Sequence, residues 1–155
     1  MAIWQVSFFI IPKVSLSEIS NLKISEDLIF DDASFWDANK TNIDFFEEMG
    51  DILPKSKSWS NYITLFGSEN SNRVEVLSKD GIVESVSFRI DFTSNYEFVL
   101  QGIIEFCILK GLIILDQNLQ MVPLNYEIAK NFVEKAPEVE TYDYLLNKTQ
   151  KNTPK

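Results

Sequence analysis

The sequence predicts an α+β fold: a single domain in which a mostly antiparallel sheet of about five or six strands packs with three or more helices. Two stretches carry this prediction. In residues 83–92, VESVSFRIDF, apolar and polar side chains alternate, which is the period of a strand buried on one face. Residues 96–110 are apolar around most of a helical circumference, which indicates a helix at the centre of the core.

The chain begins with a β-rich segment. Residues 3–11 are apolar on both alternating faces, which is typical of a central strand covered on both sides, and Pro12 ends it. Ser15, followed three residues later by Glu18, forms a capping box that predicts a short helix. From there to Lys40 no period is sustained, so we expect a long, partly ordered loop.

A further helix is expected to begin at Thr41, which can cap it with Asp44 at the third helical position, and to end at Pro54. Its inward positions are Ile43, Phe46, Met49 (or Gly50) and Leu53. Its outward positions are acidic: Asp44, Glu47, Glu48 and Asp51. This pattern is that of an amphipathic helix with one acidic face.

Three strands should follow. Residues 61–67 predict a short strand that ends at Gly67, and residues 72–92 predict a hairpin whose Asp80-Gly81 turn is the strongest local signal in the chain. The second hairpin strand would bury Val86, Phe88, Ile90 and Phe92. Its polar face would carry Ser85, Ser87, Arg89 and Asp91.

The last third should contain helices around a second, small hairpin. We expect Ser94 or Asn95 to cap the helix at 96–110, Gly111 to end it, and residues 112–122 to form the hairpin. Asn125 should cap a helix that turns Ile128, Ala129, Phe132 and Val133 inward, with a further turn or two after Pro137. We therefore expect one domain over residues 1–146 and a disordered polar tail over residues 147–155.

Composition narrows the class of protein. A chain of 155 residues that is 45% hydrophobic can bury a sufficient core, and its one cysteine, Cys107, lies in an apolar run that suits core packing in a reducing compartment. The N-terminal apolar segment lacks a basic region and a cleavage site, and charges interrupt the run at 98–115. We expect a soluble, cytoplasmic protein. Its lysine and asparagine usage suggests a bacterial source.

Charge is concentrated in residues 26–51, which hold nine acids and one base and so carry eight of the nine net negative charges. Such a segment disfavours binding to nucleic acid or to an anionic membrane, and it would attract a basic partner. The alternative interpretation is a solvated face that confers solubility.

The chain contains no histidine, which removes the usual serine and cysteine triads and most transition-metal sites. No glycine-rich phosphate loop or calcium loop occurs, and we expect no cofactor. The enzymatic alternative is a small carboxylate-dependent enzyme that uses magnesium near Asp31, Asp32 and Asp37.

The polar strand face has two interpretations. Arg89 and Asp91 would lie on one face, with Arg73 or Glu75 across from them, either as a lattice of ion pairs or as a binding surface rimmed by aromatic residues. Trp36 and Trp59 lie in polar segments and are candidate anchor residues for a partner.

Three segments, LPKSKSWS, LFGSENSNRVEV and VSFRIDF, lie between Leu53 and Phe92 on this small acidic scaffold. In this combination the chain resembles the stand-alone immunity proteins of bacterial polymorphic-toxin and contact-dependent inhibition systems. The resemblance implies an inhibitor without enzymatic activity that binds one cognate toxin and blocks its active site.

Our first hypothesis is therefore a protein-binding domain of the immunity type, and a self-associating structural subunit remains an alternative. Oligomeric state is left open. The candidate partner-binding residues are Asp31, Asp32, Trp36, Asp37, Asp44, Glu47, Glu48, Asp51, Trp59, Arg89 and Asp91.

Overall fold

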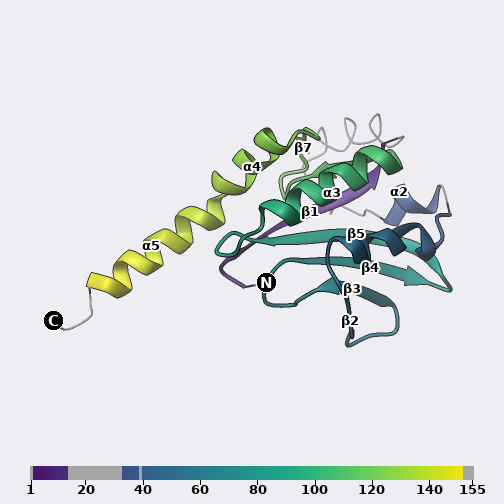
Figure 1. The fold of residues 1–155 in the computed structure, drawn as a ribbon, viewed down its shortest axis with the longest axis horizontal. Coiled ribbons are helices and arrows are strands. Elements are labelled where there is room, and N and C mark those ends of the chain that lie inside the picture. The colour runs from purple at the N-terminus through teal and green to yellow at the C-terminus, as the bar shows by residue number, and fades with distance from the viewer. Residues whose placement is uncertain (1, 14–32, 39, 152–155) are drawn as a thin grey trace.

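The computed structural model describes residues 2–13, 33–38 and 40–151. Seven strands form one antiparallel sheet in the order β2-β3-β4-β5-β1-β6-β7 (Figure 1). The strands are β1 Gln5–Pro12, β2 Lys55–Ser56, β3 Ile63–Gly67, β4 Arg73–Lys79, β5 Ile82–Asp91, β6 Leu112–Leu115 and β7 Met121–Val122. Helices complete the domain, so the predicted α+β class with an antiparallel sheet is confirmed.

Strand β1 lies inside the sheet, paired with β5 on one side and with β6 on the other, as its two apolar faces predict. Val6, Phe8 and Ile10 point into the main core, which covers the first face of the sheet. Ile11 points to the second face, where it packs in a smaller cluster with Phe35.

The hairpin of β4 and β5 forms at Asp80-Gly81 as predicted. Both turn residues have positive φ angles, 52° and 78°, which is the geometry that joins two strands with two residues. The pairing shifts register between Leu77 and Ser78, so the hairpin contains an irregularity near its turn.

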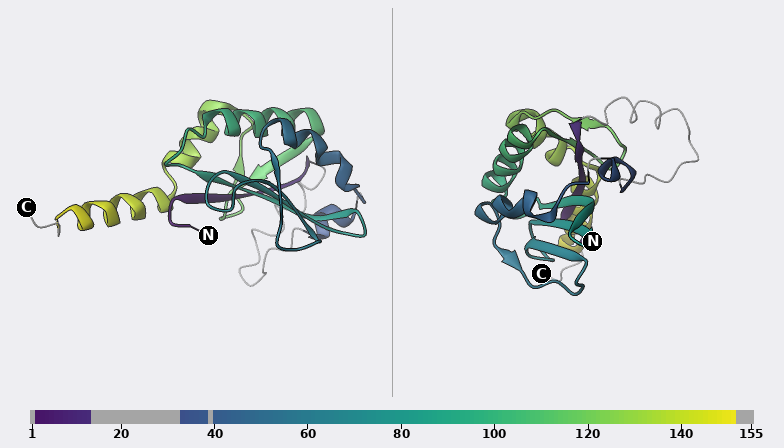
Figure 2. Two further views of the ribbon diagram at one scale, coloured as in Figure 1. Left: turned by 60° about the horizontal axis from the view of Figure 1, so that its bottom comes forward. Right: turned by 90° about the vertical axis from the view of Figure 1, so that its right-hand side faces the viewer.

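Three helices cover the first face of the sheet (Figure 2). They are η2 (Ile43–Asp51), α3 (Glu97–Lys110) and α4 (Tyr126–Glu134). The core between these helices and the sheet contains Phe46 and Met49 from η2, Ile103 and Cys107 from α3, and Val133 from α4. This core accounts for the buried side of α3, whereas Phe98, Ile108 and Leu109 of the same helix are apolar and exposed.

Helix η2 differs in detail from the expectation. It is a 3-10 helix, and Asn42 rather than Thr41 caps it, because the Asn42 side chain accepts a hydrogen bond from the Asp44 amide at 2.9 Å. The predicted facing is confirmed: Phe46 and Met49 are buried, and the acids of this helix are exposed.

At its start, α3 has Tyr96 as the N-cap, without a capping side chain. Ser94, one of the two expected caps, instead donates its hydroxyl to the Asp91 carbonyl at 2.7 Å. Gly111 ends the helix as predicted, and Asn125 caps α4 by accepting from the Ile128 amide at 3.2 Å.

A short helix, α2 (Ala33–Asp37), lies where a loop was expected. The pairing of β1 with β5 ends at Phe9, and α2 packs on both of these strands. Trp36 donates its indole N–H to the Ile10 carbonyl at 3.2 Å, and its ring lies edge-on to Phe46. This short helix is held by burial of its two aromatic side chains, Trp36 in the main core and Phe35 in the smaller cluster.

Helix α5 (Pro137–Lys151) extends away from the body of the domain (Figure 1). The sequence predicts one or two turns here and a disordered tail from residue 147, whereas the helix continues through residues 147–151. No residue in that stretch is a glycine or proline, so nothing in it breaks the helix. Near its start, the Tyr142 ring contacts Phe92 edge-on, with centroids 5.4 Å apart.

Some expectations lie outside the described residues: the short helix after Ser15, and the positions of Asp31 and Asp32. Among the helices of the described ranges, none has the length and apolar character needed to cross a membrane.

Candidate partner-binding surfaces

An acidic groove lies between η2 and α3, with a volume of about 410 Å³. We define the acidic groove by its lining residues: Glu48, Asp51, Ile52, Phe98, Gln101, Gly102, Glu105, Phe106 and Leu109. Two distant segments of sequence build it, because both helices lie side by side on the first face of the sheet (Figure 2).

The groove combines exposed apolar side chains with carboxylates. Phe98 is 72% exposed and Leu109 is 74% exposed, although both are large and apolar. Glu48 and Asp51 on one side and Glu105 on the other bring three carboxylates to the same groove. Such a surface suits a partner segment that presents both apolar and basic side chains.

One ion pair of the protein itself lies at this surface. Lys110 approaches Glu48 at 3.3 Å and lies over the Phe45 ring, 5.1 Å from its centroid. The lysine is held by aromatic rings as well as by charge, so a cation is already accepted at the edge of the groove.

The structure brings together only part of the predicted acidic site. Glu48 and Asp51 line the groove, whereas Asp44 and Glu47 are exposed on η2 without lining it. Asp37 is exposed on α2, a different element.

The contribution of α3 to the groove was not predicted from the sequence. Phe98, Gln101, Glu105 and Leu109 follow one another at intervals of three and four residues, so they form one stripe of the helix. Gln101 and Glu105 mark the stripe as solvent-facing. That signal could have identified Phe98 and Leu109 as exposed apolar residues.

The prediction that Trp36 is a surface anchor for a partner is wrong. It is 1% exposed and belongs to the main core, so its side chain is not on the surface. The polar residues around Trp36 indicate a surface loop. The sequence alone does not reveal that the Ile10 carbonyl accepts a hydrogen bond from the indole N–H. Trp59, by contrast, is 59% exposed and available to a partner.

The second face of the sheet carries the polar side chains of β4 and β5. Arg73 pairs directly with Arg89, and Glu75 pairs with Ser87. Arg73 also donates to Glu75, and its guanidinium lies over the Trp59 ring. The expected cross-strand arrangement is therefore present, with two arginines opposite each other rather than an arginine opposite an acid.

The prediction that Asp91 contacts a partner is also wrong, because Asp91 is buried in a hydrogen-bond network that holds the loop between β3 and β4. Its carboxylate accepts from the Ser71 hydroxyl at 3.0 Å and from the Thr93 amide at 2.9 Å. The Asn72 side chain accepts from the Asp91 amide at 2.8 Å. An acid with these partners organises the loop and has little capacity left for a ligand.

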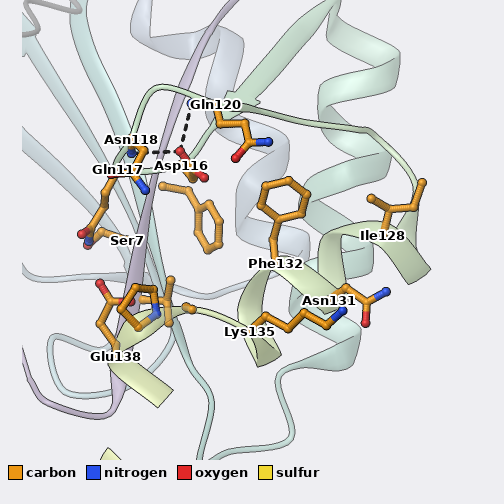
Figure 3. A pocket seen from close by; sticks show the side chains of 14 residues that line it. Ser7, Asp116, Gln117, Asn118, Gln120, Ile128, Asn131, Phe132, Lys135 and Glu138 are labelled. Carbon is orange, nitrogen blue, oxygen red and sulfur yellow. Dashed lines mark hydrogen bonds between the residues drawn. The ribbon is translucent and has the colours of Figure 1, made fainter. Parts of the chain in front are cut away.

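A second pocket, of about 450 Å³, lies between β1, the β6–β7 turn and α4 (Figure 3). Ile128, Asn131 and Phe132 of α4 line the pocket (Figure 3), and Val6 and Phe8 of β1 also contribute to its lining. Asp116 is occupied by the turn, since it accepts from the Asn118 and Gln120 amides at 2.9 Å each. The remaining lining is mixed in charge, with Lys135 and Glu138 both present.

Two kinds of catalytic site can be tested against the described residues: a cysteine nucleophile and a bound metal ion. Burial raises the pKa of the Cys107 thiol to about 12, so a thiolate nucleophile is disfavoured there. Within residues 2–13, 33–38 and 40–151, no three acids or cysteines lie close enough together to hold a metal ion. The magnesium hypothesis also involves Asp31 and Asp32, which lie outside those ranges.

Comparisons of the chain with protein-family models, with curated proteins and with solved structures found no match.

Proposed function

We propose that this protein is a non-enzymatic, cytoplasmic protein-binding domain, an immunity-type inhibitor that neutralises a basic bacterial toxin by covering its active site. The observation that carries the proposal is the acidic groove, where the exposed apolar residues Phe98 and Leu109 lie among three carboxylates.

The apolar residues supply the affinity in this proposal. Complete burial of a side chain such as Phe98 or Leu109 contributes about 1.5–3 kcal/mol each. Exposed large apolar side chains that lie together and are rimmed by polar groups are a common mark of a protein interface. Burial of both in a complex would form its central contact.

The carboxylates supply rate and selectivity. A net charge of −9 attracts a basic partner over a distance, and Glu48, Asp51 and Glu105 would place that attraction at the groove. Enzymes that act on nucleic acid bind phosphates with basic side chains. A groove that accepts those side chains would compete with the substrate of such a toxin.

The form of the sheet edges supports a contact through side chains rather than by strand addition. The edge strands β2 and β7 each have two residues, which is too short to act as a template for a further strand. This observation favours the inhibitor over the alternative of a structural subunit that associates through its sheet edge.

The proposal is tested by affinity capture from the native host. Wild type is compared with Phe98→Ser/Leu109→Ser and with a control, Met121→Ser/Tyr144→Ser, which removes exposed apolar residues outside the groove. We expect wild type and control to retain one stoichiometric basic protein, weakened by salt, and the groove variant to lose it. Circular dichroism verifies that all three are folded.

The retained protein is then assayed for its own activity. An immunity-type inhibitor should abolish that activity at a one-to-one ratio. Equal retention by all three proteins would exclude the groove as the contact, and an unaffected partner activity would exclude inhibition.

A further inference from the structure

The chain contains two arginines, Arg73 and Arg89, and the fold places them side by side. They pair directly across β4 and β5, so both side chains lie on the second face of the sheet. Like charges directly opposite each other on adjacent strands are destabilising. In a protein of net charge −9, these two cations with the one carboxylate of Glu75 beside them leave a local excess of positive charge.

Arg73 is the buried member of the pair, with 5% of its surface exposed. One terminal nitrogen donates to Glu75, and the Trp59 ring centroid lies 5.6 Å from the guanidinium carbon. Its Nε is buried and has no hydrogen-bond partner in the described part of the chain. Buried hydrogen-bond donors in proteins rarely lack an acceptor, so the unpaired Nε indicates that an acceptor is missing from this site.

Arg89 is the more exposed member of the pair, half-buried on the second face of the sheet. Burial and then the charge of Arg73 lower the pKa of Arg89 from its usual value, whereas Glu75 raises it. Glu75 is thus shared between two cations, and among the described residues Arg89 has no ion pair of its own.

We propose that Arg73 and Arg89 form a binding site for an oxyanion, either a phosphate or a carboxylate, on the second face of the sheet. A guanidinium presents planar donors that match two oxygens of such a group, and a negative ligand removes the repulsion between the two arginines. Trp59, which covers Arg73, forms one wall of the site. The site lies on the opposite face from the acidic groove, so it does not depend on the proposed inhibitor function.

The test is thermal unfolding of the full chain in sodium chloride, sodium phosphate and sodium acetate at equal ionic strength. We expect about 50 mM phosphate or acetate to raise the Tm of wild type by about 3 °C over chloride. Arg89→Gln should lose this increase. An increase with phosphate alone assigns the site to phosphate, one with acetate alone assigns it to carboxylate, and equal increases assign it to any oxyanion.

Phosphate also stabilises proteins without a site, because it is excluded from their surfaces. That effect is the same in every variant, so the control is Lys79→Gln, which removes an exposed charge from the same hairpin. The control should respond as wild type does. An equal increase in wild type, Arg89→Gln and Lys79→Gln would overturn the proposal, as would no increase in wild type. Arg89 is chosen for substitution because the buried Arg73 contributes to the folded structure.

Discussion

Gly102 of α3 lies against Ile52, the residue that caps the C-terminal end of η2. A Cβ atom at residue 102 would stand 3.0 Å from both Cγ atoms of Ile52, which is closer than side chains normally pack. The glycine therefore sets the spacing of the two elements that form the acidic groove.

We predict that Gly102→Ala lowers stability in wild type but raises it in an Ile52→Ala background. Alanine favours the helix over glycine by about 1 kcal/mol, and overpacking against Ile52 costs about 1–3 kcal/mol in wild type. Urea unfolding of the four proteins in this double-mutant cycle measures both effects. The same sign in both backgrounds would show that the contact with Ile52 is not what selects glycine.

The two exposed pairs of acids on η2 provide a matched comparison of charge. Glu48→Lys/Asp51→Lys reverses the groove pair, and Asp44→Lys/Glu47→Lys reverses the same charge outside the groove. With the captured partner, we expect the groove variant to slow association by tenfold or more at about 0.02 M salt, and the other variant to slow it less. The difference should shrink at about 0.2 M salt.

Stopped-flow association at the two salt concentrations gives both rates. Equal slowing by the two variants would mean that net charge, rather than the groove, steers the partner. Thermal unfolding provides a control for the loss of the ion pair between Glu48 and Lys110.

Trp36 and Trp59 should respond very differently to substitution by phenylalanine. Trp36→Phe removes the donor to the Ile10 carbonyl and leaves space in the core, so we expect a loss of about 2–4 kcal/mol. Trp59→Phe changes an exposed ring over Arg73 and should cost less than about 1 kcal/mol. Guanidinium unfolding curves measure both values, and a small effect at Trp36 would contradict its place in the core.

Alkaline pH should destabilise the protein through Cys107. Burial raises the pKa of its thiol to about 12 from a usual value of 9.0, so the unfolded state loses its proton first as the pH rises. The stability that depends on the protonated thiol is therefore complete below pH 9 and declines above it, by up to about 1.4 kcal/mol per pH unit.

Urea unfolding at pH 8 and at pH 10 tests this dependence against Cys107→Ala. The variant should lose less stability between the two pH values than wild type does. An identical loss in both proteins would show that the thiol is not the group responsible. A thiol reagent should also react with wild type only after unfolding.

The accuracy of the sequence predictions depended on whether the signal was local. The Asp80-Gly81 turn, the cap at Asn125 and the end of α3 at Gly111 need only adjacent residues, and all three were predicted correctly. Alternation along β5 correctly assigned Val86, Phe88 and Ile90 to the core, because a single buried face imposes a period of two.

Features that depend on distant partners were missed. The partner of Trp36 is the carbonyl of Ile10, 26 residues away, so no local pattern reveals α2 or its place between β1 and β5. Strand β2 has two residues and therefore no period to detect. In the same way, the acidic side of the groove was visible in the sequence, whereas its apolar side on α3 required the two helices to be placed together.

Because α5 projects from the body of the domain, its amide hydrogens should exchange with water faster than those of the core. Beyond Tyr142 the helix exposes Tyr144, Leu145 and Leu146, so little tertiary packing holds its outer turns. A helical segment of that length is marginal in water by itself, and it should open many times before the domain unfolds. Its amides should exchange quickly, while those of α3, beneath which the core is packed, should exchange only when the whole domain opens. The outer turns of α5 should therefore open much faster than the rest of the domain, which includes the acidic groove.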